Sequence, residues 1–165
     1  MSLQMCAPLE VGLNVYDLAK MRAFYETQLG LQFINEVRVA PAKAQHAALS
    51  RTGYVVVRLQ TQRGERLKLL AAETPVAPRA TQPAFILDAP NSAYLTFIIK
   101  DLRAACARLQ AYGSEFLTGA EPIEVRPGTW LAFLRDPEGN VVELVQYDDL
   151  AAYRSDLATA PVGHK

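Results

Sequence analysis

Apolar and polar residues alternate from Leu9 to Val15, and this period of two is typical of a β-strand with one buried face. Apolar residues then recur at helical spacing between Leu18 and Leu29, and Gly30 ends that pattern. Strand-like runs rich in β-branched and aromatic residues follow at 32–37, 54–60 and 65–70. The first half therefore predicts a strand, a helix and three further strands.

The second half repeats this order. A strand pattern at 94–99 leads to helical spacing that ends at Gly113, and strand-like runs follow at 114–117, 129–135 and 140–146. Asp17 and Asp101 stand just before the two helical patterns, 84 positions apart, where a short carboxylate can accept a hydrogen bond from the first-turn amides. The pattern therefore predicts two βαβββ modules.

A proline-rich segment separates the two modules. We expect a first module over 1–74, a linker over 75–92, a second module over 93–147, and a helix and tail over 148–165. A module of this size leaves one face of its curved sheet bare. The fold class expected is therefore α+β, with both modules forming one eight-stranded, cup-like assembly, within one chain or by exchange with a second chain.

Composition narrows the partners of the chain. Half of the 165 residues are hydrophobic, and 17 basic residues balance 17 acidic ones, so nucleic acid is not an expected partner. No apolar run approaches the roughly 18 residues of a membrane span, and no secretory leader is visible, so a cytoplasmic protein is expected. Cys6 and Cys106 are expected to be thiols, with Cys106 on the apolar stripe of a helix rather than acting as a nucleophile.

Four polar residues occupy corresponding places in the two halves. Glu10 and Tyr94 each lie seven positions before the capping aspartate, and Lys68 and Glu143 each lie four positions after a turn glycine. Because side chains in a strand alternate between faces, all four are expected to point away from the helices. They are therefore predicted to converge on one cavity, the alternative being an exposed sheet face.

Two segments carry a resemblance to a known family. Val11–Leu18, continued by Ala23-Phe24-Tyr25 and Leu29-Gly30-Leu31, resembles the opening module of the vicinal oxygen chelate superfamily, and Asp136–Leu144 is similar to its closing hairpin. That superfamily includes glyoxalase I, bleomycin-resistance proteins, extradiol dioxygenases and methylmalonyl-CoA epimerase. The resemblance covers about residues 8–147 and implies paired βαβββ modules around a cup that holds one divalent ion in the metal-using members.

The metal site of the family is altered in this sequence. The family pattern takes a His from the first strand of each module and a Glu or Gln from the last, and only Glu143 fits; Glu10, Tyr94 and Lys68 stand at the other three positions. An ammonium has no lone pair for a metal and repels a dication. No cofactor is therefore expected, and Lys68 is hypothesised to supply the positive charge by pairing with Glu10 and Glu143. The alternatives are that Lys68 extends to the rim, or that Glu10 and Glu143 bind one Zn, Ni, Mn or Fe ion.

The resemblance implies a small organic substrate with adjacent oxygen atoms. Proton-transfer chemistry of the lyase or isomerase type needs no redox ion, so Glu10 or Glu143 is the candidate base, and Lys68 and Tyr94 are candidates to stabilise an enolate. The first alternative is a non-catalytic binding protein of the bleomycin-resistance type, and the second is a metal-dependent dioxygenase. A homodimer is expected because the family often forms one.

Other candidates have a simpler interpretation. His46, in a possible lid loop over 39–51, is expected to be solvated, and His164 lies in the tail. Arg58, Arg66 and Arg126 could contact an anionic substrate, although solvation at a strand edge is the favoured role. Trp130 either lines the cavity or belongs to the core.

Overall fold

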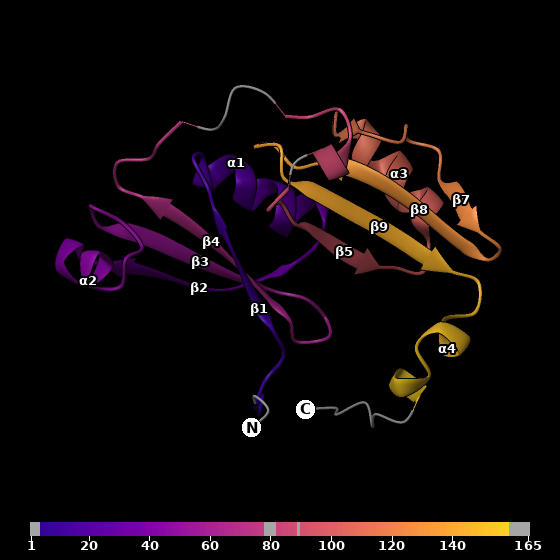
Figure 1. Ribbon diagram of the computed structural model, residues 1–165, viewed down its shortest axis with the longest axis horizontal. Coiled ribbons are helices and arrows are strands. Elements are labelled where there is room, and N and C mark those ends of the chain that lie inside the picture. Colours follow the sequence, from indigo (N-terminus) through magenta and orange to yellow (C-terminus); the bar gives the residue numbers. More distant parts are fainter. Residues whose placement is uncertain (1–3, 78–81, 89, 159–165) are drawn as a thin grey trace. The chain divides into compact units, whose positions relative to one another are not determined.

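The alternating segments of the first half form one four-stranded sheet. The computed structural model describes residues 4–77, 82–88 and 90–158. Its first compact unit, Met1–Gln82 (unit 1), contains strands in the order β1-β4-β3-β2, with β1 parallel to β4 and the other neighbours antiparallel (Figure 1). The strands are β1 (Glu10–Asn14), β2 (Gln32–Val39), β3 (Tyr54–Gln60) and β4 (Arg66–Ala72).

One face of this sheet is covered by the helix predicted after the first strand. α1 (Leu18–Arg22) begins at Asp17, whose carboxylate accepts a hydrogen bond from the Lys20 amide at 3.0 Å, and it lies against β4 (Figure 1). The helix continues as a π-helical segment, η1 (Ala23–Gln28), in which the adjacent residues Phe24 and Tyr25 are both buried. Their rings meet edge to face at 5.0 Å and fill the core beneath the sheet.

The predicted lid loop contains a short helix. α2 (Pro41–His46) has proline at its first position, where the missing N–H costs nothing, and two alanines that favour helix formation. Ala44 is fully buried and His46 is exposed. The prediction that His46 is solvated is therefore confirmed. The segment is not an entirely irregular loop, because part of it forms α2.

The second compact unit, Pro83–Lys165 (unit 2), repeats the topology with one modification. β5 (Tyr94–Ile98) is parallel to β9 (Val141–Tyr147), which is antiparallel to β8 (Thr129–Arg135). Two short strands, β6 (Glu115–Phe116) and β7 (Ile123–Arg126), both pair with β8, so this sheet has five strands. Together they take the place that β2 fills in unit 1. The intervening segment contains Gly119 at positive φ and Pro122, which interrupt strand pairing.

The helix of unit 2 also begins as predicted. α3 (Leu102–Ala111) has Asp101 as its N-cap, with the carboxylate 2.9 Å from the Ala104 amide, and it lies against β8 and β9. Cys106 is buried on the face of α3 that contacts the sheet, and burial raises the pKa of its thiol. Cys6 is an exposed thiol. Both cysteines are free, as predicted, and the core position of Cys106 is confirmed.

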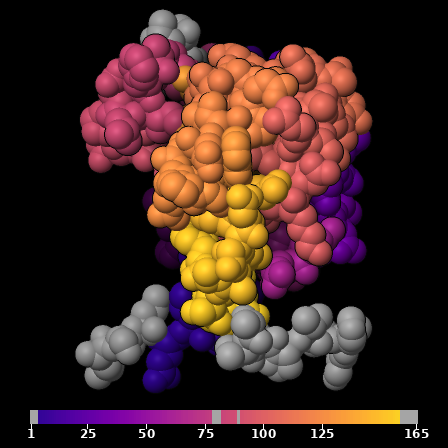
Figure 2. Space-filling view, turned by 90° about the vertical axis from the view of Figure 1, so that its right-hand side faces the viewer, coloured from indigo at the N-terminus to yellow at the C-terminus, as the bar shows by residue number. Residues whose placement is uncertain are grey.

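The C-terminal helix is shorter than the predicted one. α4 (Leu150–Tyr153) ends at Arg154, whose backbone leaves the helical region, and a 3₁₀ turn, η3 (Ser155–Ala158), follows. Tyr153 stacks on Tyr147 of β9 with ring centroids 3.9 Å apart, and the Arg126 guanidinium lies 5.6 Å from the Tyr153 ring centre. Figure 2 shows this segment in yellow beside the orange strand region of unit 2. A short 3₁₀ helix, η2 (Ile86–Asp88), lies in the proline-rich segment, and His164 lies outside the described residues.

Candidate functional site

The pairing of β1 with β4 brings two of the predicted site residues together in unit 1. Gly12 lies opposite Lys68, and Glu10 lies opposite Arg66, in the parallel register. The Glu10 carboxylate is 3.6 Å from the Lys68 ammonium and 3.6 Å from the Arg66 guanidinium. Lys68 stands between the buried residues Leu67 and Leu69, which face the helix. Lys68 therefore projects from the opposite face, which we call the open face of unit 1.

The open face of unit 1 contains a pocket of about 310 Å³. Residues of β1, β3 and β4 form its floor and walls, and one residue follows α2: the lining consists of Gly12, Asn14, Leu49, Tyr54, Val56, Arg58, Lys68 and Leu70. Gly12 keeps the floor open, since a Cβ there would lie 3.1 Å from Leu70 Cδ1 and 4.0 Å from Lys68 Cε. The pocket is thus mainly apolar, with two cationic side chains.

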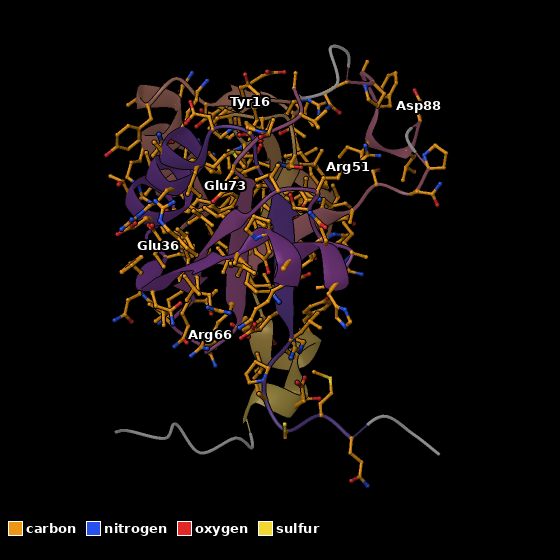
Figure 3. All side chains as sticks on the ribbon, turned by 90° about the vertical axis from the view of Figure 1, so that its left-hand side faces the viewer. Tyr16, Glu36, Arg51, Arg66, Glu73 and Asp88 are labelled. Atoms are coloured by element: carbon orange, nitrogen blue, oxygen red, sulfur yellow. The ribbon has the colours of Figure 1, made fainter. Side chains whose placement is uncertain are left out.

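Arginine side chains add positive charge to the same face. Arg58 belongs to β3, which lies between β2 and β4, and its guanidinium donates a hydrogen bond to Asn35 Oδ1 at 3.1 Å. Strand-edge solvation is therefore the wrong role for Arg58, because β3 is an interior strand and the side chain lines the pocket. Arg66, at the start of β4 (Figure 3), donates to Gln60 Oε1 at 2.8 Å besides its ion pair with Glu10.

The other two predicted site residues lie on the corresponding face of unit 2. The Thr96 hydroxyl, opposite Glu143 in the β5–β9 register, donates a hydrogen bond to Glu143 Oε2 at 2.6 Å. Tyr94 is 46% exposed, and its ring meets that of Phe133 edge to face at 5.5 Å. Glu143 is thus oriented by a neighbouring strand, as Glu10 is oriented by two cations in unit 1.

The strand registers support the correspondence between the halves. Gly12 pairs with Lys68 in unit 1, and Thr96 pairs with Glu143 in unit 2, so Lys68 and Glu143 have the same place in their sheets. The structure brings Glu10 and Lys68 together and places Tyr94 and Glu143 on one face of unit 2. The convergence of all four on a single interior point stays a prediction.

The side chains at the family's ligand positions do not fit its metal ion. Each of the two units supplies one carboxylate at these positions, Glu10 and Glu143, and the remaining two are an ammonium and a phenol. The ammonium of Lys68 lies 3.6 Å from Glu10, where it opposes a dication at the same carboxylate. Within the described part of the chain, no group of three His, Cys, Asp or Glu side chains could hold a metal ion.

Two further candidates belong to unit 2, where Trp130 lies on the helix side of β8 and Arg126 lies on the face that carries Glu143. Trp130 shares a strand face with the buried residues Ala132 and Leu134 and is itself half-buried, so it lies on the helix side of the sheet and not on the face of Tyr94 and Glu143. Arg126 donates a hydrogen bond to Thr129 Oγ1 at 3.0 Å, and its guanidinium lies over the ring of Tyr153. Arg126 therefore contacts the C-terminal segment.

Sequence reasoning did not identify the apolar part of the pocket. Tyr54, Val56 and Leu70 resemble ordinary strand residues, and their common pocket depends on the strand order, which alternation does not reveal. Alternation puts Thr96 on the same strand face as Tyr94, but its position opposite Glu143 depends on the pairing of β5 with β9.

Comparison with known proteins identifies the family. The family model of the Glyoxalase/Bleomycin resistance protein/Dioxygenase superfamily matches residues 7–144, so the chain belongs to this superfamily. Among curated proteins, none is similar enough to the sequence to count as a match.

Solved structures share the fold at low sequence identity. A glyoxalase family protein from Bacillus cereus is 21% identical with a TM-score of 0.73, over 88% of this chain and 96% of that one. The trypanothione-dependent glyoxalase I of Leishmania major is 18% identical with a TM-score of 0.63, over 96% and 100% of the two chains. Glyoxalase I from Zea mays is 18% identical with a TM-score of 0.65, over 87% of this chain and 45% of that one. These likenesses support the predicted α+β fold class. None of the helices in the described residues has the length and hydrophobicity needed to span a bilayer.

Proposed function

We propose that this chain binds a small organic substrate at the open face of unit 1 and transfers a proton on it, as a lyase or isomerase that uses no metal ion. The observation that carries this proposal is the Glu10–Lys68 ion pair, which stands at two positions where metal-using members place ligands to the ion. A fixed ammonium beside a pocket can stabilise an oxygen that becomes negative during the reaction. In this proposal Lys68 has the electrostatic role that the dication has in metal-using members.

The proposed step balances with the residues at hand. A substrate carbonyl oxygen accepts a hydrogen bond from the Lys68 ammonium, and a carboxylate removes the proton from the neighbouring carbon. The electron pair of that C–H bond moves toward the carbonyl and leaves an enolate oxygen beside Lys68. Glu10 is the base within unit 1, and Glu143 is the alternative base. Return of the proton to the opposite face of that carbon completes an epimerisation, whereas its return to the same face regenerates the substrate.

Solvent exchange tests this proposal directly. The protein is incubated in D₂O with a panel of 2-oxo acids, thioesters and hemithioacetals, and deuterium at the carbon next to the carbonyl is followed by proton NMR. We expect exchange by the wild type, loss of at least 90% of the rate in Glu10→Gln, and a comparable loss in Lys68→Ala. Glu36→Gln is the matched control, since Glu36 is an exposed residue opposite Val57, which faces the helix. Rates that are unchanged in both Glu10→Gln and Lys68→Ala would remove the catalytic assignment from unit 1, and Glu143→Ala then tests the alternative base.

A non-catalytic binding protein is the second candidate. Its support is the apolar lining of the pocket by Leu49, Tyr54, Val56 and Leu70, which suits capture of a ligand without chemistry. Saturable binding of a panel compound without any exchange in the wild type would favour this function.

Metal independence has a separate test. The protein is incubated with Ni, Zn, Mn or Fe(II), desalted, and analysed for metal content. We expect far less than one ion per chain. A stoichiometric ion that is lost in Glu10→Gln would overturn the metal-free proposal and favour a metal-dependent reaction, including the dioxygenase alternative.

A further inference from the structure

The open face of unit 1 carries an excess of positive charge. By the strand registers, the charged residues on this face are Glu10, Arg58, Arg66 and Lys68, which is three cations against one carboxylate. Arg66 and Lys68 both lie near Glu10, at 3.6 Å each. Arg58 has no carboxylate partner among the residues that the structure describes. A ligand that brought a negative charge to this face would therefore reduce this excess.

The two cations that line the pocket keep hydrogen-bond donors for such a ligand. No described residue accepts a hydrogen bond from the Lys68 ammonium, because its ion pair with Glu10 at 3.6 Å is longer than a hydrogen bond. Arg58 has five N–H donors and uses one on Asn35 Oδ1. A guanidinium and an ammonium on neighbouring strands, opposite each other in the β3–β4 register, form a suitable pair of partners for one carboxylate.

The rest of the pocket limits what the anion can be. Val56 and Leu70 lie one step further along the same face, and Tyr54 and Leu49 complete an apolar wall. The volume of about 310 Å³ lies at the lower end of the roughly 300–1,000 Å³ that is typical of small-molecule sites, which is room for a small organic molecule. A fully polar anion such as phosphate would leave the apolar wall without a contact.

We infer that the ligand of this pocket is a small organic carboxylate with an apolar body, whose carboxylate lies between Arg58 and Lys68 and whose body contacts Val56, Leu70 and Tyr54. This inference rests on the proposed function, and it names the substrate class of the same site. It makes Arg58 a determinant of specificity rather than of chemistry.

The test compares one acid with its uncharged counterpart. Binding of 4-methyl-2-oxopentanoate and of 4-methyl-2-oxopentanamide is measured by calorimetry on the full chain, and NMR amide shifts locate the site. We expect the acid to bind at least tenfold more tightly than the amide, about 1.4 kcal/mol, and to shift the Gly12 amide signal. Arg58→Gln should weaken the acid at least tenfold and change the amide far less. Lys68→Met should also weaken the acid at least tenfold, and it should weaken the amide to a smaller extent, because Lys68 is the partner of the carbonyl oxygen that both compounds carry. Arg58→Lys should recover part of the loss.

Arg38→Gln is the matched control, because Arg38 is exposed and lies opposite Val55, whose side chain belongs to the other face of the sheet. Equal affinities for acid and amide in the wild type, or acid binding that survives both Arg58→Gln and Lys68→Met, would overturn the inference. Acid binding with the expected dependence but no deuterium exchange would support the inference and refute the enzymatic function. Deuterium exchange on the amide, together with equal affinities for acid and amide, would support the enzymatic function and refute the inference.

Discussion

The ion pair between Glu10 and Lys68 allows a quantitative test of the unit 1 site. At 3.6 Å, the Coulomb energy of two unit charges is about 1.2 kcal/mol in a dielectric of 80 and about 4.6 kcal/mol in one of 20. The side chains of Lys68 and Glu10 are 32% and 35% exposed, so solvent screening favours the lower end. We therefore expect a coupling free energy of about 0.5–1 kcal/mol in a double-mutant cycle of Glu10→Gln and Lys68→Met.

The single variants should differ in a way that the geometry dictates. Glu10→Gln removes the carboxylate that lies 3.6 Å from both Arg66 and Lys68, and these two cations then repel each other along β4. It should lower the free energy of unfolding by about 1 kcal/mol, and Lys68→Met should lower it by about half as much. Adding Lys68→Met to Glu10→Gln should lower the free energy of unfolding little or not at all, because the second substitution removes one of the two cations that repel each other.

Urea unfolding followed by circular dichroism measures these differences. Fluorescence is less suitable, since the single tryptophan, Trp130, belongs to unit 2. The control cycle is Arg103 and Glu121, an ion pair whose side chains are 72% and 81% exposed and whose coupling should be close to zero. A Glu10–Lys68 coupling no larger than this control, or one that does not shrink in 0.5 M salt, would refute the reasoning.

Three further predictions concern thiols, capping and titration. In the native protein a thiol reagent should modify Cys6 quickly and Cys106 only at the rate of unfolding, because Cys106 is buried and its pKa is raised; rapid modification of two thiols per chain would contradict this. Asp101→Ala should lower the free energy of unfolding of unit 2 by about 1 kcal/mol, measured by Trp130 fluorescence, with Asp101→Asn close to wild type. Burial and a hydrogen bond with Tyr153 raise the pKa of Tyr147 to about 12. The stability that the protonated phenol contributes is therefore complete below pH ~10 and lost between pH ~10 and ~12, and Tyr147→Phe should flatten this part of the pH–stability curve; an unchanged curve would contradict it.

Much of the fold follows from local periodicity. The runs predicted at 54–60 and 129–135 coincide with β3 and β8, and both predicted aspartate caps accept their hydrogen bonds. These features depend on neighbouring residues, so a single sequence contains the information. The π-helical segment after Arg22 is different. It places the adjacent residues Phe24 and Tyr25 together in the core, and tertiary packing selects that geometry.

The candidate site was only partly accessible from the sequence for a related reason. Corresponding positions in the repeat identified Glu10 and Lys68 as neighbours on one face, because alternation and spacing suffice for that. The role of Arg58 depends on β3 being an interior strand, and strand order is a property of the whole sheet. In the same way, the divided strand β6–β7 depends on local breaks at Gly119 and Pro122 rather than on the pattern shared by the halves.

The parallel pairing of β1 with β4 has a consequence for synthesis on the ribosome. Glu10 finds its partner Arg66 only 56 positions later, and Tyr94 finds Val141 only 47 positions later. The antiparallel pair β2–β3 can form earlier, since both of its strands precede β4 in the chain. The first strand of each unit therefore waits unpaired in the nascent chain until the last strand has emerged, and an incomplete chain that ends before β4 exposes a strand edge that a chaperone or a second nascent chain can occupy.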